Sequence, residues 1–361
     1  DENGIYTFRA EAKNTLTVRF AGDENLRDYD KDDDGNDLSA YNEDVYLKSI
    51  WEGDTVYQES ALFVTGRDTV KLLYPVDEVI SLRSYDLKTN YVEGVDYEVT
   101  AEGAIRRLAG SRIPVYTGAL TTATNNGYPL KDGTGYLSFM GDTTYPQYAV
   151  SVTYKHTATY EDGYTPAAPA SQSRKLADTI AKLEAGETVN IAIYGDSISC
   201  GWSSSGLNNT NGIYDDTNTE GSFKSYVINV APYAPTWIDM FLFGLQKRYP
   251  EAIINLKNLS LGGKGASWGR ENIADRLALW RDSKGDQVTP DLLLVGFGVN
   301  DAAGNIPAST FKIYSQGIVD NARTGNSNLE VLFYSPMLPN QKAEAWDQEK
   351  LLGYENALAA I

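Results

Sequence analysis

The C-terminal half of the chain alternates short apolar runs with helical patterns, and this alternation constrains the fold most strongly. Four runs are typical of strands, at residues 189–194, 253–259, 291–297 and 330–335. Helical patterns lie at 174–185 and near 236–248, 269–281, 308–322 and 342–361. Strands that are apolar along their whole length are covered on both faces. The alternation therefore predicts an α/β domain with a parallel sheet between helices.

The first 160 residues follow a different pattern, in which polar and apolar residues alternate and long helical patterns are absent. Residues 15–20 and 148–154 alternate in this way, as strands with one buried face do. Turn signals such as Lys131-Asp132-Gly133 recur at short spacing. We predict an all-β sandwich of jelly-roll kind over 1–160, a Pro/Ala/Ser/Gly-rich linker over 161–173, and the α/β domain over 174–361.

Charge and cysteine content limit the possible partners. The chain has 31 Lys and Arg against 49 Asp and Glu, a net charge of −18, which disfavours nucleic acid and suits neutral polysaccharides. A single cysteine, Cys200, allows no intrachain disulfide and no cysteine-rich zinc site. No run approaches the ~18 apolar residues of a membrane span. The start at Asp1 fits either a mature secreted protein or a trimmed chain, and 25 tyrosines with few lysines and one cysteine suit a secreted or cell-surface bacterial protein.

Three short polar motifs follow three of the predicted strands in order. They are Gly195-Asp196-Ser197-Ile198, Asn258-Leu259-Ser260-Leu261-Gly262-Gly263 and Gly298-Val299-Asn300-Asp301. Ligands bind at the carboxyl ends of parallel strands, so the amides of Ser197, Gly263 and Asn300 could converge on one oxyanion. Each motif alone is more simply a turn, a loop or a helix cap. Together they indicate a serine nucleophile with an oxyanion hole.

With these motifs, residues from about 187 to 361 resemble the SGNH hydrolase superfamily, also called GDSL-type esterases. The resemblance implies a three-layer α/β/α sandwich with a flavodoxin-like parallel sheet. It also implies Ser197 as the nucleophile, with Asp196 in support, and Gly263 and Asn300 as oxyanion donors. Residues 148–157, the linker and 235–237 resemble bacterial two-domain carbohydrate acetylesterases. That likeness implies removal of acetyl groups from plant polysaccharides or oligosaccharides, with no cofactor.

The general base of this family is a histidine in a late Asp-x-x-His motif, which the 361 residues do not contain. The one histidine, His156, lies before all three motifs, and a structural or surface role is the simpler interpretation. The family core would continue with another strand and a closing helix, so we expect an incomplete domain with its base beyond Ile361. A serine without a base is a weak nucleophile, so this chain should hydrolyse activated esters poorly.

Two alternatives stay open beside polysaccharide deacetylation. A lipid or lysophospholipid esterase of the same superfamily would need an apolar groove, and the polar insertion over 203–230 argues mildly against it. An alternative from another class is a carbohydrate-binding or adhesive surface protein with a catalytically dead hydrolase domain, which would be favoured if the natural chain also ended at Ile361.

Two weaker signals remain. Trp268 could stack on a sugar, although a core position in the following helix is the simpler interpretation. Asp30, Asp32 and Asp34 have the spacing that opens a calcium loop, but Tyr41 stands where such a loop needs a glutamate. We therefore expect a solvated acidic loop and no metal.

Overall fold

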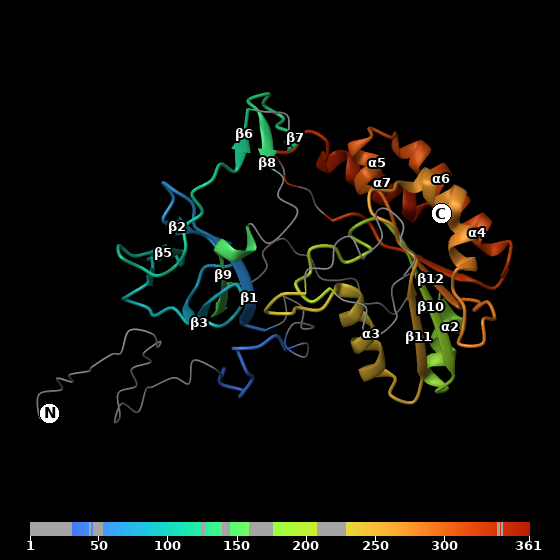
Figure 1. The fold of residues 1–361 in the computed structure, drawn as a ribbon, viewed down its shortest axis with the longest axis horizontal. Helices are drawn as coiled ribbons and strands as arrows, with labels where there is room; N and C mark the ends of the chain where they lie inside the picture. Colours follow the sequence, from blue (N-terminus) through green and yellow to red (C-terminus); the bar gives the residue numbers. More distant parts are fainter. Residues whose placement is uncertain are drawn as a thin grey trace, which may run out of the picture.

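The computed structural model describes residues 31–42, 45, 53–123, 127–138, 145–158, 176–207, 229–337, 340 and 342–361. Figure 1 shows two domains side by side, one built of short strands and one of strands and helices. The expected linker, 161–173, and the strand expected over 15–20 lie outside the described residues.

The β domain holds antiparallel sheets of three strands. In the first, β9 (Ala149–Lys155) lies between β1 (Thr55–Leu62) and β3 (Glu78–Ser84), and η1 (Pro146–Tyr148) precedes β9. In the second, β5 (Ile105–Arg107) lies between β2 (Thr69–Val70) and β4 (Tyr97–Val99). These two sheets share one apolar core, which includes Phe63, Leu82, Ile105 and Val152. The predicted all-β domain before the α/β domain is therefore confirmed.

A third small sheet joins the β domain to the other domain. It has the order β6 (Thr121–Thr122), β8 (Tyr136–Ser138), β7 (Gly127–Pro129). The end of β7 and the residues that follow it pair with the segment at 342–344. Glu344 N donates to Pro129 O at 2.9 Å, and Lys131 N donates to Lys342 O at 3.0 Å. Beside this pairing, the rings of Tyr128 and Trp346 lie 4.1 Å apart. Both backbone and side-chain contacts thus connect the domains.

The central sheet of the second domain is parallel, with the order β11-β10-β12-β13. Its strands are β10 (Thr188–Gly195), β11 (Ile253–Asn258), β12 (Leu292–Gly296) and β13 (Glu330–Phe333). Each coincides with one of the four predicted runs. The predicted parallel sheet is confirmed.

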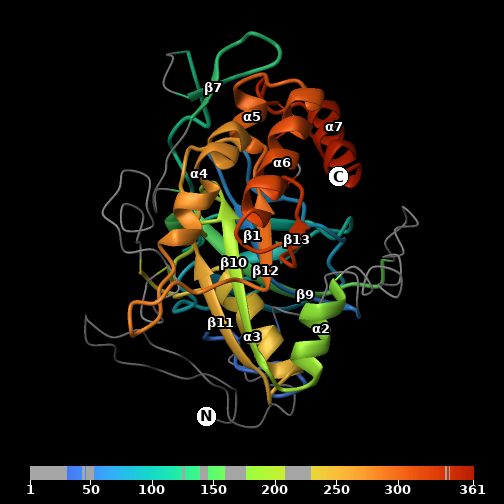
Figure 2. The same ribbon diagram turned by 90° about the vertical axis from the view of Figure 1, so that its right-hand side faces the viewer.

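Helices cover both faces of this sheet (Figure 2). The helices on one face are α2 (Ala177–Glu184) and α3 (Trp237–Arg248), and those on the other are α4 (Ala266–Ala278), α6 (Ala308–Arg323) and α7 (Gln348–Ala359). Side chains alternate along β10, so Ile191 and Ile193 pack toward α2 and α3, while Ala192 and Tyr194 pack toward α4, α6 and α7. The predicted α/β/α layering is confirmed.

Two helices begin at other residues than the sequence pattern predicts. The predicted helix at 269 begins at Ala266, because the Asp301 carboxylate, from a distant part of the chain, accepts hydrogen bonds from the Ala266 N–H. The predicted helix near 342 begins only at Gln348, because residues 342–344 pair with the β domain. In both cases a contact between segments far apart in sequence decides the boundary.

None of the helices in the described part of the chain combines the length and apolarity that crossing a bilayer requires.

Candidate active site

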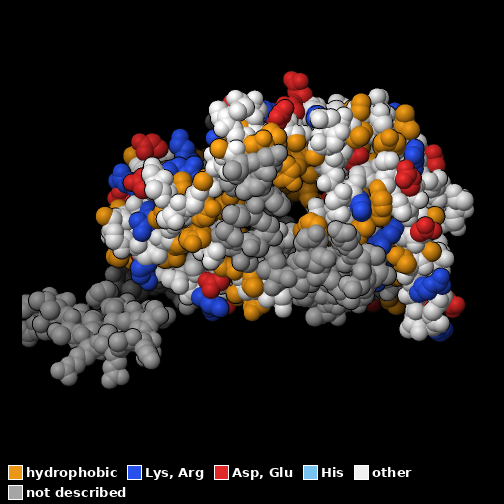
Figure 3. Space-filling model, turned by 45° about the horizontal axis from the view of Figure 1, so that its top comes forward, with side chains coloured by type: hydrophobic (Ala, Val, Ile, Leu, Met, Phe, Trp, Pro, Cys, Tyr) orange, Lys and Arg blue, Asp and Glu red, His pale blue; other side chains and the backbone are white. Residues whose placement is uncertain are grey.

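The three polar motifs meet at one cavity of about 1160 Å³ between the two domains. Ser197, Gly263 and Asn300 line it from the second domain. They follow β10, β11 and β12, whose carboxyl ends lie at the same edge of the parallel sheet. Figure 3 shows the surface hollowed between the domains, with hydrophobic side chains around the hollow. The opposite wall comes from the β domain and includes Leu62, Leu120, Thr121, Tyr128, Leu137 and Tyr145.

Ser197 lies in a run of hydrogen-bonded turns over residues 197–203. Cys200 N donates to Asp196 O at 2.9 Å, and Trp202 N donates to Ser197 O at 3.2 Å. Gly201 and Ser203 have φ values of 73° and 66°, which a right-handed helix does not accommodate. The serine therefore follows β10 on a compact turn.

Neighbouring elements hold this turn in place. Trp237 Nε1, on α3, donates to Ile198 O at 2.9 Å, and Asn258 Nδ2, at the end of β11, donates to Ser199 O at 2.8 Å. The buried Ser199 hydroxyl donates to Gly296 O at 3.0 Å and accepts from Tyr334 Oη at 2.6 Å. Buried polar groups paired in this way fix a single geometry. Apart from Asn258, which opens the second motif, these partners lie outside the three motifs, and only the fold brings them to the turn.

Glycine at 195 is required by the close packing of the same turn. A Cβ there would lie 2.0 Å from Ser199 Oγ and 2.2 Å from Gly296 O. The strand end and the turn can therefore approach each other only because residue 195 has no side chain.

Asn300 and Asp301 hold the loop that carries Gly263. Asn300 Nδ2 donates to Lys264 O at 2.9 Å, and both oxygens of Asp301 accept from Ala266 N at 3.0 Å. Gly263 has a φ of +74°, and a Cβ there would meet nothing within 4 Å. Its backbone conformation, rather than a lack of space, favours glycine. An amide nitrogen carries two N–H groups, so Asn300 can donate one to the loop and one to a ligand.

Residues 193–361 match the model of the GDSL-like Lipase/Acylhydrolase family. The C-terminal domain is therefore similar to this family, and we call it the GDSL-like domain. This confirms the family resemblance drawn from the three motifs. No curated protein sequence matches the chain.

Several solved structures are similar to the chain at low identity. A two-domain esterase active on acetylated mannans, crystallised with mannopentaose, is 19% identical with a TM-score of 0.33, over 52% of this chain and 40% of that one. TesA is 16% identical with a TM-score of 0.31, over 47% and 71%. Axe2, an acetylxylan esterase from Geobacillus stearothermophilus, is 13% identical with a TM-score of 0.32, over 48% and 70%. The chain thus spans 40% of the length of the two-domain esterase.

Two buried carboxylates support the backbone of the GDSL-like domain near the cavity. Asp196 and Asp301 are 2% and 3% exposed. Burial, with a contribution from the charge of Asp301, raises the pKa of Asp196 to about 6, although a hydrogen bond from Ile198 N at 2.9 Å opposes the shift. Burial also raises the pKa of Asp301. Neither residue is among those that line the Ser197 cavity, so both act on the backbone that carries it.

His156 lies in the β domain and does not line the Ser197 cavity. It is 5% exposed, and its ring stacks on Tyr74 at a centroid distance of 4.0 Å. Its Nδ1 lies 2.9 Å from the carbonyl oxygen of Ala158. This environment is that of a structural histidine. The described residues that line the cavity therefore include no histidine to act as a base for Ser197.

Trp268 lies on α4 and packs against the core, with its ring 5.8 Å from that of Tyr194. It is not among the residues that line the Ser197 cavity. Cys200 is 1% exposed, and burial raises the pKa of its thiol to about 12. Trp268 therefore has the core position that we considered the simpler interpretation, and neither Trp268 nor Cys200 lines the Ser197 cavity.

In the acidic loop at residues 31–36, the carboxylate of Asp32 accepts hydrogen bonds from protein groups. Asp32 Oδ1 accepts from Asp34 N at 3.0 Å and Asn36 N at 2.8 Å, and Oδ2 accepts from Asn36 Nδ2 at 2.7 Å and Tyr57 Oη at 2.9 Å. Asp30 lies outside the described residues. Within the described part of the chain, no three His, Cys, Asp or Glu residues are grouped to hold a metal ion.

Proposed function

We propose that the protein is a serine-dependent carboxylic ester hydrolase that removes acetyl groups from polysaccharides or oligosaccharides. The observation that carries the proposal is that Ser197, Gly263 and Asn300 line one cavity. Ser197 Oγ attacks the acetyl carbonyl, while the N–H groups of Ser197 and Gly263 and Nδ2 of Asn300 donate to the oxyanion. The sugar hydroxyl then leaves with a proton. Water attacks the acyl-enzyme, releasing acetate and restoring Ser197.

The lining of the cavity supports a carbohydrate substrate. Trp202, Tyr128 and Trp346 offer aromatic faces, which suit sugar rings, and Thr121 and Asn340 offer polar groups. The net charge of −18 disfavours strongly anionic polymers. A secreted or cell-surface location in a bacterium would bring the enzyme to such a polymer.

The proposed reaction needs a proton acceptor that the described cavity residues do not include. We therefore expect slow turnover when no base is added. An added imidazole base should raise the rate of acyl transfer to Ser197, because the oxyanion donors are already in place.

Fluorophosphonate labelling, followed by intact mass and peptide mapping with and without imidazole, tests this proposal. One adduct on Ser197 is expected, formed faster with imidazole and absent from Ser197→Ala. Ser203→Ala is the matched control, because Ser203 lines the same cavity and should not be labelled. Labelling at another residue, or none at all, would refute Ser197 as the nucleophile. Labelling without acetate release from acetylated oligosaccharides, even with imidazole, would favour the catalytically dead carbohydrate-binding protein.

One observation favours a second candidate, a lipid or lysophospholipid esterase. A cavity of about 540 Å³ shares Ile198 and Val299 with the Ser197 cavity and is otherwise largely apolar, with Trp237, Phe241, Leu332 and Met337 in its lining. A fatty acyl chain would suit such a lining. Aryl esters of increasing acyl length separate the candidates, because a deacetylase should prefer acetate and a lipid esterase should prefer octanoate or longer chains.

A further inference from the structure

A second crevice, of about 520 Å³, continues from the Ser197 cavity along the boundary between the domains. The two spaces share Leu62, Tyr145 and Ser203 in their lining. A ligand longer than one sugar and bound at Ser197 could therefore extend into this crevice.

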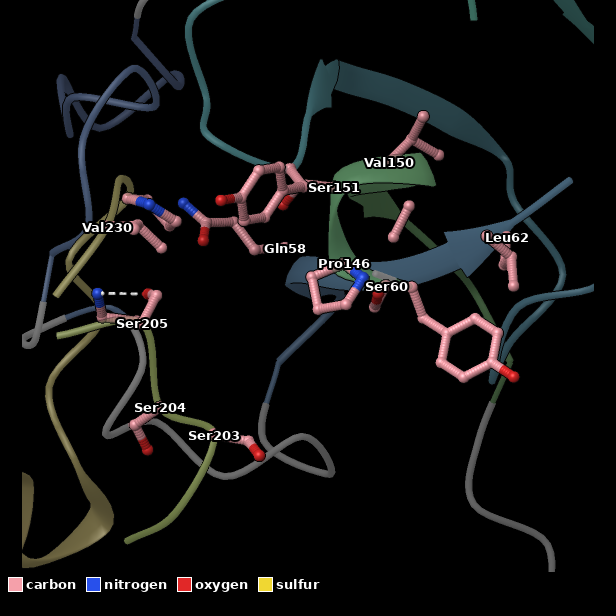
Figure 4. A pocket seen from close by; sticks show the side chains of 15 residues that line it. Gln58, Ser60, Leu62, Pro146, Val150, Ser151, Ser203, Ser204, Ser205 and Val230 are labelled. Carbon is pink, nitrogen blue, oxygen red and sulfur yellow. Dashed lines mark hydrogen bonds between the residues drawn. The ribbon is translucent and has the colours of Figure 1, made fainter. Parts of the chain in front are cut away.

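The crevice is lined by uncharged side chains from both domains, some polar and others apolar, such as Leu62 and Val150. Gln58, Ser60 and Ser151 come from the β domain, and Ser203, Ser204 and Ser205 come from the end of the Ser197 turn and the residues that follow it (Figure 4). None of the described lining residues carries a charge, and Tyr85 and Tyr145 add aromatic rings. Hydroxyl and amide groups beside aromatic rings suit a neutral polyhydroxylated ligand better than a phosphate or a charged peptide.

Gln58 is the residue that points most directly to a ligand. It lies in β1, where the pairing with β9 shifts register between Val56 and Glu59, and its φ is 49°. Bulges of this kind re-aim a side chain and are common beside functional sites. The Nε2 atom of Gln58 is buried and has no hydrogen-bond partner in the described structure. An unpaired buried donor is destabilising, and a ligand oxygen in the crevice would satisfy it.

We propose that this crevice is a distal subsite, which binds sugar units next to the one that is deacetylated at Ser197. Gln58 Nε2 donates to a hydroxyl or ring oxygen of a neutral oligosaccharide there, and the serine hydroxyls on the facing wall add further hydrogen bonds. The inference rests on the proposed function, because it takes the polymer held at Ser197 as the occupant.

Protection of Ser197 against fluorophosphonate by oligosaccharides of defined length tests the subsite. The probes are acetylated β-1,4-linked oligomers of xylose and of mannose with two to six sugars, and each variant is compared with its own labelling rate without sugar. Five- and six-sugar oligomers should protect at about tenfold lower concentration than two-sugar oligomers. Gln58→Met should remove most of this difference. Gln287→Met should leave it intact, because Gln287 is exposed and does not line the crevice.

Thermal unfolding separates a binding role from a structural one. Gln58→Met removes an unpaired buried amide, so it should melt no lower than the parent chain. If it melts lower, Gln58→Glu, which keeps the shape but lacks the donor N–H, replaces it in the protection assay. Equal protection by short and long oligomers, or an unchanged length dependence in both Gln58 variants, would overturn the subsite alone. Failure to label Ser197 in the parent chain would instead overturn the proposed function.

Discussion

The two walls of the Ser197 cavity are built in different ways. The wall from the GDSL-like domain consists of strand ends fixed by buried hydrogen bonds, such as Asn258 to Ser199 and Ala266 to Asp301. The wall from the β domain is attached through the pairing of residues 129–131 with 342–344 and the contact of Tyr128 with Trp346. A buried network holds one geometry, whereas a packed contact near the surface can adjust. We therefore expect the first wall to govern the chemistry and the second to govern which substrates fit.

The largest effect should follow from removing an oxyanion donor on the first wall. Asn300→Ala should slow imidazole-assisted labelling of Ser197 by about 100-fold, the usual magnitude for one such donor. Asn321→Ala is the control, because this asparagine donates to Arg270 O on an exposed surface of the same domain. A decrease of less than about threefold for Asn300→Ala would mean that this side chain does not contact the oxyanion.

The second largest effect concerns Asp196, the buried carboxylate next to Ser197, and the pH dependence of stability. Burial raises the pKa of Asp196 to about 6, so the folded state binds its proton more tightly than the unfolded state, and stability falls as the pH rises from about 4 to 6. Asp196→Asn should remove this fall and stabilise the protein at pH 8 by about 2–3 kcal/mol, with no gain below pH 4. Urea unfolding at pH 3.5, 5 and 8 measures the difference. A gain that does not depend on pH would contradict an ionised, desolvated Asp196.

A smaller effect on stability is expected from weakening the contact that attaches the second wall. Trp346→Ala removes the packing on Tyr128 and the 2.9 Å hydrogen bond from Nε1 to Val299 O, so the midpoint of thermal unfolding should fall by an amount equivalent to about 2 kcal/mol. Sugar protection of Ser197 should weaken, while labelling without sugar changes less than for Asn300→Ala. A larger loss of labelling than in Asn300→Ala would break the proposed division between the two walls.

The smallest effect should come from the ion pair between Lys131 and Asp347, which joins the domains at 2.7 Å but is exposed at both side chains. Exposed pairs of this kind are weak and screened by salt. Lys131→Ala should leave the unfolding midpoint nearly unchanged, and any difference should vanish in 0.5 M NaCl, a concentration at which the screening length is only about 4 Å. Asp347→Ala should lower the midpoint more, because Asp347 also accepts from Glu349 N at the start of α7.

Much of the GDSL-like domain could be predicted from local sequence. The strands appear as apolar runs because both faces of the sheet are covered, and the motifs that follow them contain Ser197, Gly263 and Asn300. The conformation of the turn after Ser197 could not be predicted, because φ values above zero at Gly201 and Ser203 are not evident from residue type alone. The start of α4 depends on the hydrogen bond from Ala266 N to Asp301, which lies 35 residues further along the chain. Local helix propensity cannot predict such a contact.

The sequence by itself determined the α/β domain, the family resemblance and the residues proposed for the oxyanion hole, because periodicity and strand-end motifs are local properties of the chain. Only the tertiary structure decided that Gln58, Tyr128 and Tyr145 of the β domain line the spaces that adjoin Ser197. It also placed His156 in a separate core beside Tyr74. Packing between domains brings together residues that are far apart in the chain. Short sequence patterns cannot predict which surfaces come into contact.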